Sequence, residues 1–344
     1  MNSPSPFSAT SLLITGGAGF IGSNFVRHFL ETRGEATSLT VLDALTYAGN
    51  LENLADILDS IHFVKADIRD ADAVGRVMEE QRIDAVVHFA AESHVDRSIL
   101  GPMVFTETNV LGTHVLLEQG RKHGIQRFVH VSTDEVYGSL GPEGRFSELS
   151  PLDPTSPYAA SKAASDMLVQ SYAKTFAFPA MITRCSNNYG PWQFPEKLIP
   201  LMLINAMNDK PLPVYGDGLN VRDWIHTRDH VDAIIAVLEY GQSGRVYNIG
   251  SDNEWPNIDI VKLILRTLNK PESLIRYVAD RPAHDRRYAI ESERIRVELG
   301  WSPKIPFEEG IAETIAWYQE HQNWWTRVMS GAYADYYQTQ YGNR

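Results

Sequence analysis

The chain has 344 residues, of which 43% are hydrophobic and 22% charged, and its formal net charge is −12 at pH 7. This composition is typical of a globular protein with a sizeable core. The negative charge argues against nucleic acid or an anionic membrane as the main partner, although a few local arginines suffice to bind a phosphorylated ligand.

Cysteine usage and the N-terminus indicate the compartment. The one cysteine, Cys185, excludes an internal disulfide, which is typical of a reducing environment. Residues 1–11 lack the basic start and apolar core of a signal peptide, and no apolar run approaches the roughly 20 residues that span a bilayer. We expect a cytoplasmic protein whose residues 1–10 are disordered or extended. No Cys/His spacing indicates a metal, so we expect none.

The first predicted strand, 11–15, runs directly into a glycine-rich turn and then into a helix through Leu30. Gly16, Gly19 and Gly22 permit a tight turn that lets backbone N–H groups approach a pyrophosphate at the start of the helix. A strand before the glycines and a helix after them is the context that dinucleotide binding requires. The alternative is a glycine turn in a fold that binds no nucleotide.

The second predicted strand, 39–43, ends in Asp43, about twenty residues after the last glycine of the turn. A carboxylate at this place accepts hydrogen bonds from the adenosine ribose and discriminates against a 2′-phosphate. The sequence therefore favours NAD over NADP as the cofactor.

Two further strands are predicted at 61–68 and 85–91, with helices between the strands. This alternation predicts an α/β fold with a doubly wound parallel (Rossmann-type) sheet. We expect Asp67 near the adenine, unless it caps the helix that follows. Residues 90–93 are expected near the pyrophosphate or the nicotinamide ribose, and His94 is either a ligand contact or a histidine satisfied by its neighbours.

Residues 108–118 predict an amphipathic helix, whose apolar stripe packs in the core or against another subunit. A short buried strand at 127–131 follows and leads into Ser132-Thr-Asp-Glu-Val-Tyr-Gly138. This stretch places a hydroxyl and two adjacent carboxyl groups at a strand end, where ligands bind in an open α/β sheet.

A helix from Tyr158 to about Phe176 follows a loop at 141–157 that is rich in Pro, Ser and Gly. Tyr158 and Lys162 are four residues apart and share one helix face. An ammonium beside a phenol favours the phenolate, so we expect Tyr158 to act as a base near neutral pH. Since Asp134 and Glu135 supply groups for a second proton transfer, the pattern predicts two coupled reactions in one pocket.

The composition changes after Cys185, where amides, aromatic residues and arginines gather. The stretch 281–288 is a basic cluster that suits a diphosphate bound to a sugar; a solvated, salt-bridged surface is the alternative. We expect an NAD-binding domain at 11–185, to which segments around 218–250 return. A smaller C-terminal α/β substrate-binding domain is expected at 186–330.

These motifs together resemble a known family. Thr15-Gly-Gly-Ala-Gly-Phe-Ile-Gly22 and Tyr158-x-x-x-Lys162 resemble the extended short-chain dehydrogenase/reductase superfamily. The stretches 90–97, 132–138, 187–191, 194–200 and 280–288 narrow the resemblance to the dTDP-glucose 4,6-dehydratases. The resemblance covers the chain from about Ser11 to Tyr333, and the Asp-Glu pair is its part specific to 4,6-dehydratases.

The resemblance implies a reaction sequence. Tyr158, helped by Lys162, would take the proton of the sugar 4-hydroxyl while hydride leaves C4 for NAD, and Thr133 would hydrogen-bond that oxygen. The new ketone acidifies the C5 proton, which Glu135 would remove while Asp134 protonates the departing 6-hydroxyl. Hydride would then return to C6, which gives dTDP-4-dehydro-6-deoxy-glucose and water.

The resemblance also assigns the binding residues. Those for NAD, besides the three glycines, Tyr158 and Lys162, are Phe20, Ile21, Asp43, Thr46, Asp67, Ile68, Ala90, Ala91 and Thr108. Those for the nucleotide sugar are Ser93, Thr133, Asn187, Glu196, Lys197, Leu198, Pro213, Tyr215, Arg222, Asn257, Arg281, His284 and Tyr288. Ala283 stands where the family pattern usually has Gly, so its methyl is expected to tighten or shift this loop. Relatives are homodimers formed through two helices, here 108–123 and 158–176.

Three other functions compete with this one. A nucleotide-sugar 4-epimerase or decarboxylase shares the fold but lacks the paired carboxyl groups after the threonine. A 4,6-dehydratase of UDP- or GDP-sugars would differ in the base-binding pocket around Leu198, Pro213 and Tyr215. A redox-sensing protein that binds NAD without turnover usually loses the Tyr/Lys pair, which this chain keeps.

Overall fold

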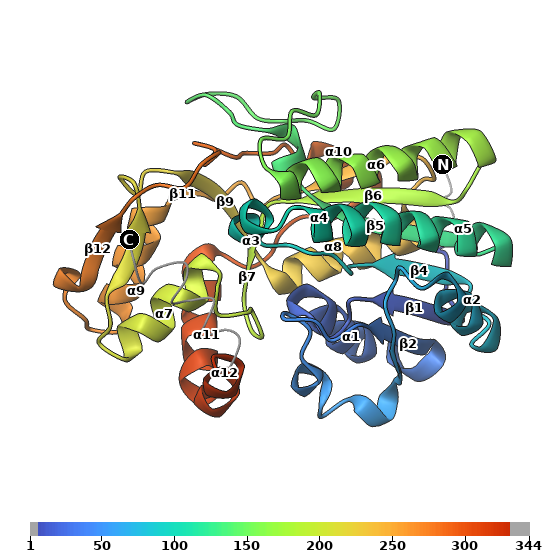
Figure 1. The fold of residues 1–344 in the computed structure, drawn as a ribbon, viewed down its shortest axis with the longest axis horizontal. Helices are drawn as coiled ribbons and strands as arrows, with labels where there is room; N and C mark the ends of the chain where they lie inside the picture. Colours follow the sequence, from blue (N-terminus) through green and yellow to red (C-terminus); the bar gives the residue numbers. More distant parts are fainter. Residues whose placement is uncertain (1–5, 331–344) are drawn as a thin grey trace.

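A parallel sheet of seven strands forms the larger part of the molecule, on the right in Figure 1. In order across the sheet, the strands are β10 (Val246–Ile249), β6 (Ala180–Cys185), β5 (Arg127–Thr133), β4 (Ala85–His88), β1 (Ser11–Thr15), β2 (Ser38–Asp43) and β3 (His62–Lys65). The chain order reverses between β1 and β4, and ligands bind beyond the C-terminal strand ends at such a reversal. The predicted doubly wound α/β sheet is confirmed.

Helices cover both faces of this sheet because side chains alternate along its strands. Leu12 and Ile14 of β1 belong to one apolar cluster, whereas Leu13 belongs to another. The helices over the first cluster are α1 (Phe20–Arg33), α8 (Thr227–Tyr240) and α10 (Glu293–Leu299). The helices over the second are α2 (Ala71–Glu80), α5 (Thr113–His123) and α6 (Pro157–Phe176).

A smaller part, on the left in Figure 1, is built on two small sheets. Its strands are β7 (Asn187–Tyr189), β9 (Val221–His226) and β11 (Glu254–Pro256) in one sheet, and β8 (Leu212–Tyr215) and β12 (Ile275–Val278) in the other. Its helices are α7 (Leu198–Met207), α9 (Asn257–Thr267), α11 (Phe307–Glu320) and α12 (Gln322–Val328). Of the segment around 218–250, β9 belongs to the smaller part, and only α8 and β10 return to the large sheet.

Element bounds differ from the predicted ones where a neighbouring strand ends. The strand predicted at 61–68 stops at Lys65, because its partner β2 ends at Asp43. The strand predicted at 127–131 continues to Thr133, which lies beside Cys185 of β6. The strand predicted at 85–91 stops at His88, which aligns with Thr15 at the end of β1.

The predicted helix 108–123 begins differently from a regular α-helix. Two short helices, α3 (Val95–Leu100) and α4 (Met103–Phe105), lead into a π-helix, η4 (Thr106–Gly112), before α5 starts. A Cβ added to Gly112 would lie 2.5 Å from the Ile68 Cδ1 atom, so a larger residue there would displace the Ile68 side chain. Turns of π-helix are frequent at functional sites.

The computed structural model describes residues 6–330. The predicted N-terminal segment 1–10 therefore lies partly outside the described residues, as does the end of the family resemblance at Tyr333. Residues 6–10 form neither helix nor strand. The Phe7 amide donates a hydrogen bond to the Glu239 carbonyl at 2.8 Å, which holds this segment against α8.

Candidate active site

Two cavities meet beyond the C-terminal ends of the large sheet. One, of about 330 Å³, extends over the ends of β1, β2, β4 and β5. The other, of about 160 Å³, lies between this sheet and the smaller part of the molecule. Glu135, Asn187, Glu196 and Lys197 line both cavities, so the two form one continuous site.

Each residue named as a site residue from the sequence lines one of these cavities. The first cavity takes Gly16, Gly19, Phe20, Ile21, Gly22, Asp43, Thr46, Asp67, Ile68, Ala90, Ala91, Ser93, Thr108, Thr133, Asp134, Tyr158 and Lys162, besides the four shared residues. The second takes Leu198, Pro213, Tyr215, Arg222, Asn257, Arg281, His284 and Tyr288. The fold therefore brings these residues together, while the role of each one rests on its chemistry.

The glycine turn brings two backbone segments into contact at the strand reversal. Gly16 has a φ of 72°, and a Cβ added to it would lie 2.6 Å from the Ala90 nitrogen, so no side chain fits there. The Asp43 carboxylate at the end of β2 accepts the Ala18 amide at 3.0 Å and the Leu45 amide at 2.8 Å. Because these contacts leave a side-chain-free turn next to a carboxyl group, the cavity fits a dinucleotide with an adenosine ribose at Asp43.

Asp67 lies in the cavity and does not cap a helix. The N-cap of α2 is Asp70, whose side chain accepts the amides of Asp72 and Ala73, so the alternative role for Asp67 was wrong. Asp67 instead forms an ion pair with Arg69, with a nitrogen–oxygen distance of 2.7 Å, and hydrogen bonds from Arg69 lower the pKa of Asp67. Arg69 also lines the cavity and had no predicted role.

Tyr158 and Lys162 reach the cavity from the first turns of α6. The Ser156 side chain caps this helix by accepting the Ala159 amide, and Pro157 occupies its first position. The Lys162 ammonium donates a hydrogen bond to the Val131 carbonyl at 2.9 Å. Burial lowers the pKa of Lys162 to about 8.

The predicted lowering of the Tyr158 pKa by Lys162 was wrong for this structure. The pKa of Tyr158 is raised well above its usual value, first by burial and then by the charge of Glu135. Burial and neighbouring anions thus outweigh the ammonium one helical turn away. A negative charge on Glu135 therefore opposes loss of the Tyr158 proton.

Asp134 and Glu135 are adjacent, yet their environments differ. Burial, and after it the charges of Glu135 and Asp223, raise the pKa of Asp134 well above its usual value. Burial also raises the pKa of Glu135, but the cations Arg281, Lys197 and Arg222 oppose that shift. An acid and a base are assigned by environments of this kind. Asp134 is suited to hold a proton, and Glu135 is suited to take one.

The second cavity carries cations and apolar walls. Arg281, Arg222 and Lys197 line it together with Leu198, Leu201 and Met202 of α7. Arg222 packs over the Tyr288 ring with 4.3 Å between the guanidinium carbon and the ring centroid. Burial lowers the pKa of His94, so the imidazole that lines this cavity is neutral. Positive side chains beside an apolar slot suit a diphosphate joined to a flat base.

The basic stretch 281–288 divides between the cavity and the surface. Arg281 reaches the cavity, whereas Arg286 pairs with Asp217 at the surface, with both side chains more than half exposed. Ala283 has a φ of 51°, in the region that favours glycine. This explains why a glycine is the usual residue in the pattern, and the alanine adds strain at this turn.

Asp96 is a site residue that the sequence analysis did not identify. Its buried carboxylate accepts the Tyr215 hydroxyl at 2.9 Å on one oxygen and the Arg281 guanidinium at 2.9 Å on the other. It therefore ties two walls of the second cavity to α3. Its place in the motif 90–97 was known, but one sequence does not show which side chains meet across a fold.

We expect Asp96→Asn to raise KM for the nucleotide sugar by roughly tenfold with little change in kcat, because an amide cannot accept both hydrogen bonds. Steady-state kinetics at saturating NAD measures this effect. Asp217→Asn is the matched control, since it breaks an exposed pair with Arg286 and should leave KM unchanged. A fall in kcat with unaltered KM would contradict a binding role for Asp96.

Within residues 6–330, no helix is long and apolar enough to cross a membrane, and no cluster of three or more His, Cys, Asp or Glu residues is placed to hold a metal ion.

Comparison with known proteins places this site in context. A family model described as GDP-mannose 4,6 dehydratase matches residues 13–314. A curated dTDP-glucose 4,6-dehydratase of Xanthomonas campestris pv. campestris is 52% identical over 342 residues, covering 93% of this chain and 96% of that protein. One from Escherichia coli is 48% identical over 354 residues, covering 94% and 97%.

Solved structures give the same picture. A dTDP-glucose 4,6-dehydratase from Streptomyces venezuelae, DesIV, with NAD bound, matches with a TM-score of 0.90 and 50% identity, covering 92% of this chain and 99% of that one. A UDP-glucose 4-epimerase from Thermus thermophilus, in complex with NAD, matches with a TM-score of 0.84 and 31% identity, covering 90% and 99%. The fold is shared with epimerases, whereas the higher identity is to dehydratases.

Proposed function

Because the chain belongs to the GDP-mannose 4,6 dehydratase family, and within it to the dTDP-glucose 4,6-dehydratases, we infer that it converts dTDP-glucose to dTDP-4-dehydro-6-deoxy-glucose and water. The observation that carries the inference is the adjacent pair Asp134 and Glu135, both buried but with different neighbouring charges, in the cavity that Tyr158 also lines. An epimerase has no need of such a pair.

The cofactor of this reaction is NAD, and the first cavity fits it. When bound, NAD supplies the hydride acceptor for oxidation at C4 and the hydride donor for reduction at C6. The turn around Gly16, Gly19 and Gly22 presents backbone N–H groups to the pyrophosphate at the start of α1. Asp43 faces the ribose position, where its carboxylate discriminates against a 2′-phosphate.

Tyr158, Lys162 and Thr133 serve the oxidation at C4. Tyr158 accepts the proton of the 4-hydroxyl as the C4–H bond breaks, and Thr133 hydrogen-bonds the oxygen that becomes the ketone. Lys162, fixed by the Val131 carbonyl, brings a positive charge into the same cavity, where it opposes the effect of burial and of Glu135 on the Tyr158 phenolate. All three groups are buried and line the same cavity.

Glu135 and Asp134 serve the elimination. The 4-ketone acidifies the C5 proton, which Glu135 takes, and Asp134 gives its proton to the 6-hydroxyl as the C6–O bond breaks. One water leaves, and a C5–C6 double bond conjugated with the ketone remains. Asp134 has lost one proton and Glu135 has gained one, so the number of protons bound by the two carboxyl groups is unchanged. Reduction at C6 and return of a proton to C5 complete the product.

The second cavity holds the dTDP part of the substrate in this proposal. Arg222, Arg281 and Lys197 bind the diphosphate, while Leu198, Pro213 and Tyr215 surround the base. UDP-glucose should therefore be a poorer substrate, because it lacks the thymine methyl and carries a ribose 2′-hydroxyl that dTDP-glucose does not have. We expect kcat/KM for UDP-glucose to be lower by roughly 10- to 200-fold, the range that one missing methyl group gives in an apolar pocket. Equal kcat/KM for the two sugars would show that the methyl is not recognised.

Two functional domains follow from the same proposal. Residues 11–185, with α8 and β10, form the NAD-binding domain, and most of the remainder of 186–330 forms the nucleotide-sugar-binding domain. The position of the first cavity over the large sheet and of the second beside the smaller part supports this division. A cytoplasmic location, as proposed from the sequence, is supported by the lone free cysteine, Cys185, which suits a reducing compartment.

The protein acts as a homodimer in this proposal. Exposed apolar side chains gather on α3, α4, η4 and α6: Leu100, Met103, Leu111, Met167 and Phe176. In Figure 1 the helices α4, α5 and α6 lie along one side of the large sheet. A monomer seldom exposes so many large apolar side chains on neighbouring helices. Light scattering of Met167→Glu should show a lower mass, whereas Leu149→Glu, an exposed leucine outside these helices, should not change it.

Purified protein incubated with dTDP-glucose, without added cofactor, tests the proposed reaction. We expect a product lighter than the substrate by one water, whose NMR spectrum shows a methyl group at C6 and a ketone at C4. Formation of a C4 epimer of unchanged mass would contradict the proposed function.

A further inference from the structure

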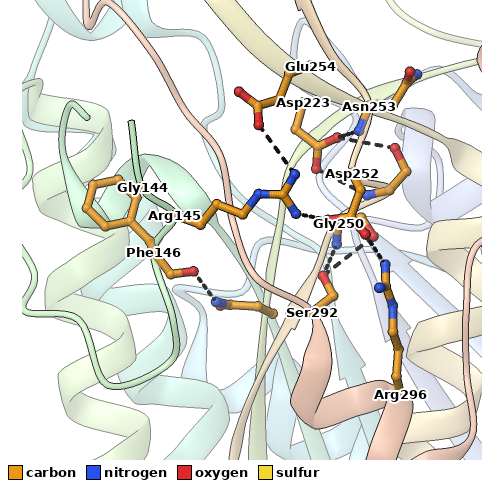
Figure 2. Close-up of polar contacts among 12 residues, drawn as sticks. Gly144, Arg145, Phe146, Asp223, Gly250, Asp252, Asn253, Glu254, Ser292 and Arg296 are labelled. Atoms are coloured by element: carbon orange, nitrogen blue, oxygen red, sulfur yellow. Dashed lines mark hydrogen bonds and ion pairs between the residues drawn. The ribbon is translucent and has the colours of Figure 1, made fainter. Parts of the chain in front are cut away.

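Asp223 is a buried carboxylate that the reaction described above does not use. It lies in β9 with only 1% of its surface exposed, and it lines neither of the two cavities. Its oxygens accept the Asn253 amide at 2.7 Å, the Ser251 amide at 3.1 Å and the Ser251 hydroxyl at 3.2 Å. Figure 2 shows this carboxylate beside the turn that contains Gly250 and Asn253. All three donors are neutral.

The cations around this turn are paired with other carboxylates. In Figure 2, Arg145 contacts Asp252 and Glu254, and Arg296 contacts Asp252. Arg287 takes the other oxygen of Glu254 at 2.7 Å. Among residues 6–330, Asp223 therefore has no ion-pair partner. Burial raises the pKa of Asp223, and the hydrogen bonds from Asn253 and Ser251 oppose that shift.

Arg222, next to Asp223 in β9, points away from it. Neighbouring residues of a strand face opposite sides, and Arg222 donates to the Val221 and Asp285 carbonyls while it lines the second cavity. The nearest arginine in the sequence is thus used for the substrate site. It does not neutralise Asp223 by direct contact.

The strand register brings β9, which carries Asp223, close to the end of β5, which leads into the catalytic pair. Thr133, the residue before Asp134, lies beside Cys185, and Asn187 lies beside Trp224, the residue after Asp223. Cys185 therefore adjoins the end of β5, and Asn187, two residues later in the chain, adjoins β9. Both carboxyl groups are buried, with 2% of Asp134 exposed, so their charges interact through a medium of low polarity.

The hydrogen bonding of Asp134 is that expected of a carboxyl group that keeps its proton. Its Oδ1 accepts only the Thr133 hydroxyl, at 3.3 Å, and its Oδ2 is buried without a hydrogen-bond partner. A buried carboxylate oxygen without a donor is costly, whereas a protonated one can donate to a ligand in the cavity. After burial and Glu135, the charge of Asp223 is the next cause that raises the pKa of Asp134.

We propose that Asp223 is a positioning residue of the elimination step: its buried, unpaired carboxylate keeps Asp134 protonated and so ready to protonate the departing 6-hydroxyl. This role rests on the proposed dehydratase reaction. The other charged or titratable groups that face Asp134 are Glu135 beside it, Tyr158 from α6, Cys185 from β6 and Arg222 from β9. Of these groups, only Arg222 carries a positive charge, and that charge lowers the pKa of Asp134.

Asp223→Asn tests this role, because it removes the charge and keeps the shape. The Asp134 pKa falls when the neighbouring negative charge is removed, so Asp134 loses its proton at lower pH. We expect the alkaline limb of the pH profile of product formation to move down by about one pH unit, so that activity on that limb is about tenfold lower. Oxidation at C4, followed in a single turnover at 340 nm, should stay near the wild-type rate.

Ser251→Ala is the matched control for the turn. It removes the hydroxyl that bonds Asp223 and the Trp224 carbonyl, but it leaves the charge in place. The control should keep the wild-type pH profile even if its melting temperature falls. An unmoved alkaline limb in Asp223→Asn, or the same movement in Ser251→Ala, would overturn the proposal. Wild-type protein that fails to form any dehydrated product would instead overturn the proposed function.

Infrared spectroscopy of the wild-type protein provides a measurement that does not depend on folding of the Asp223 variant or on turnover. The difference between wild type and Asp134→Asn isolates the carbonyl stretch of the protonated Asp134 carboxyl group. We expect this band to persist at neutral pH. Loss of the band near pH 4, the usual range of an aspartate, would show that Asp134 holds no proton and would overturn the proposal.

Discussion

Tyr158→Phe is expected to suppress oxidation at C4 and product formation together, by roughly 100- to 10,000-fold, the range of general base catalysis. Tyr158 carries the hydroxyl that takes the proton of the 4-hydroxyl, and it lines the cavity that Thr133 and Lys162 share. Phenylalanine keeps the ring but removes the proton acceptor. A single-turnover measurement at 340 nm with dTDP-glucose separates oxidation from the later steps.

Tyr172→Phe is the control for this variant. It removes the same hydroxyl from the same helix, where that hydroxyl contacts Glu118 and His114 outside both cavities. The control should turn over at nearly the wild-type rate. Unchanged single-turnover oxidation in Tyr158→Phe would remove Tyr158 from the first step.

Glu135→Gln is expected to separate the two halves of the reaction. Oxidation at C4 should stay measurable, because Tyr158 and Lys162 are intact, whereas removal of the C5 proton should fall by roughly 100- to 10,000-fold. An amide cannot accept this proton, although it fills the same space. NMR in D₂O measures the effect as lost exchange of the C5 proton with solvent.

The control for this variant is Glu148→Gln, a largely buried carboxyl group whose oxygen accepts the Asn248 amide outside the cavities. Exchange at C5 should proceed normally in this control. If exchange persists in Glu135→Gln at the wild-type rate, another group is the C5 base, and the assignment of the carboxyl pair is wrong.

The sequence was most informative where local chemistry is constrained. Three glycines between a strand and a helix specify a close backbone approach, and the structure shows that a Cβ on Gly16 would meet Ala90. Alternating strands and helices specify a parallel sheet, and its C-terminal edge collects the side chains that follow each strand. The parallel, doubly wound character of the large sheet was predictable for this reason.

Properties that depend on long-range contacts were not predictable. The pKa of Tyr158 was expected to fall because Lys162 lies one turn away, but burial and Glu135 act in the opposite direction. Asp96 joins Tyr215 and Arg281 from positions far apart in the chain, and the strand register brings β9, with Asp223, close to the end of β5. Such contacts follow from tertiary packing, and no spacing in one sequence specifies them.

The central claim is that the sugar becomes a ketone at C4 for a short time, and that the hydride taken from C4 ends at C6. dTDP-glucose labelled with deuterium at C4 tests this directly when the product is analysed by NMR. The account predicts that the deuterium appears in the C6 methyl group of a product that has lost water. Deuterium that remains at C4, or that is lost to solvent while the methyl group forms, would contradict it.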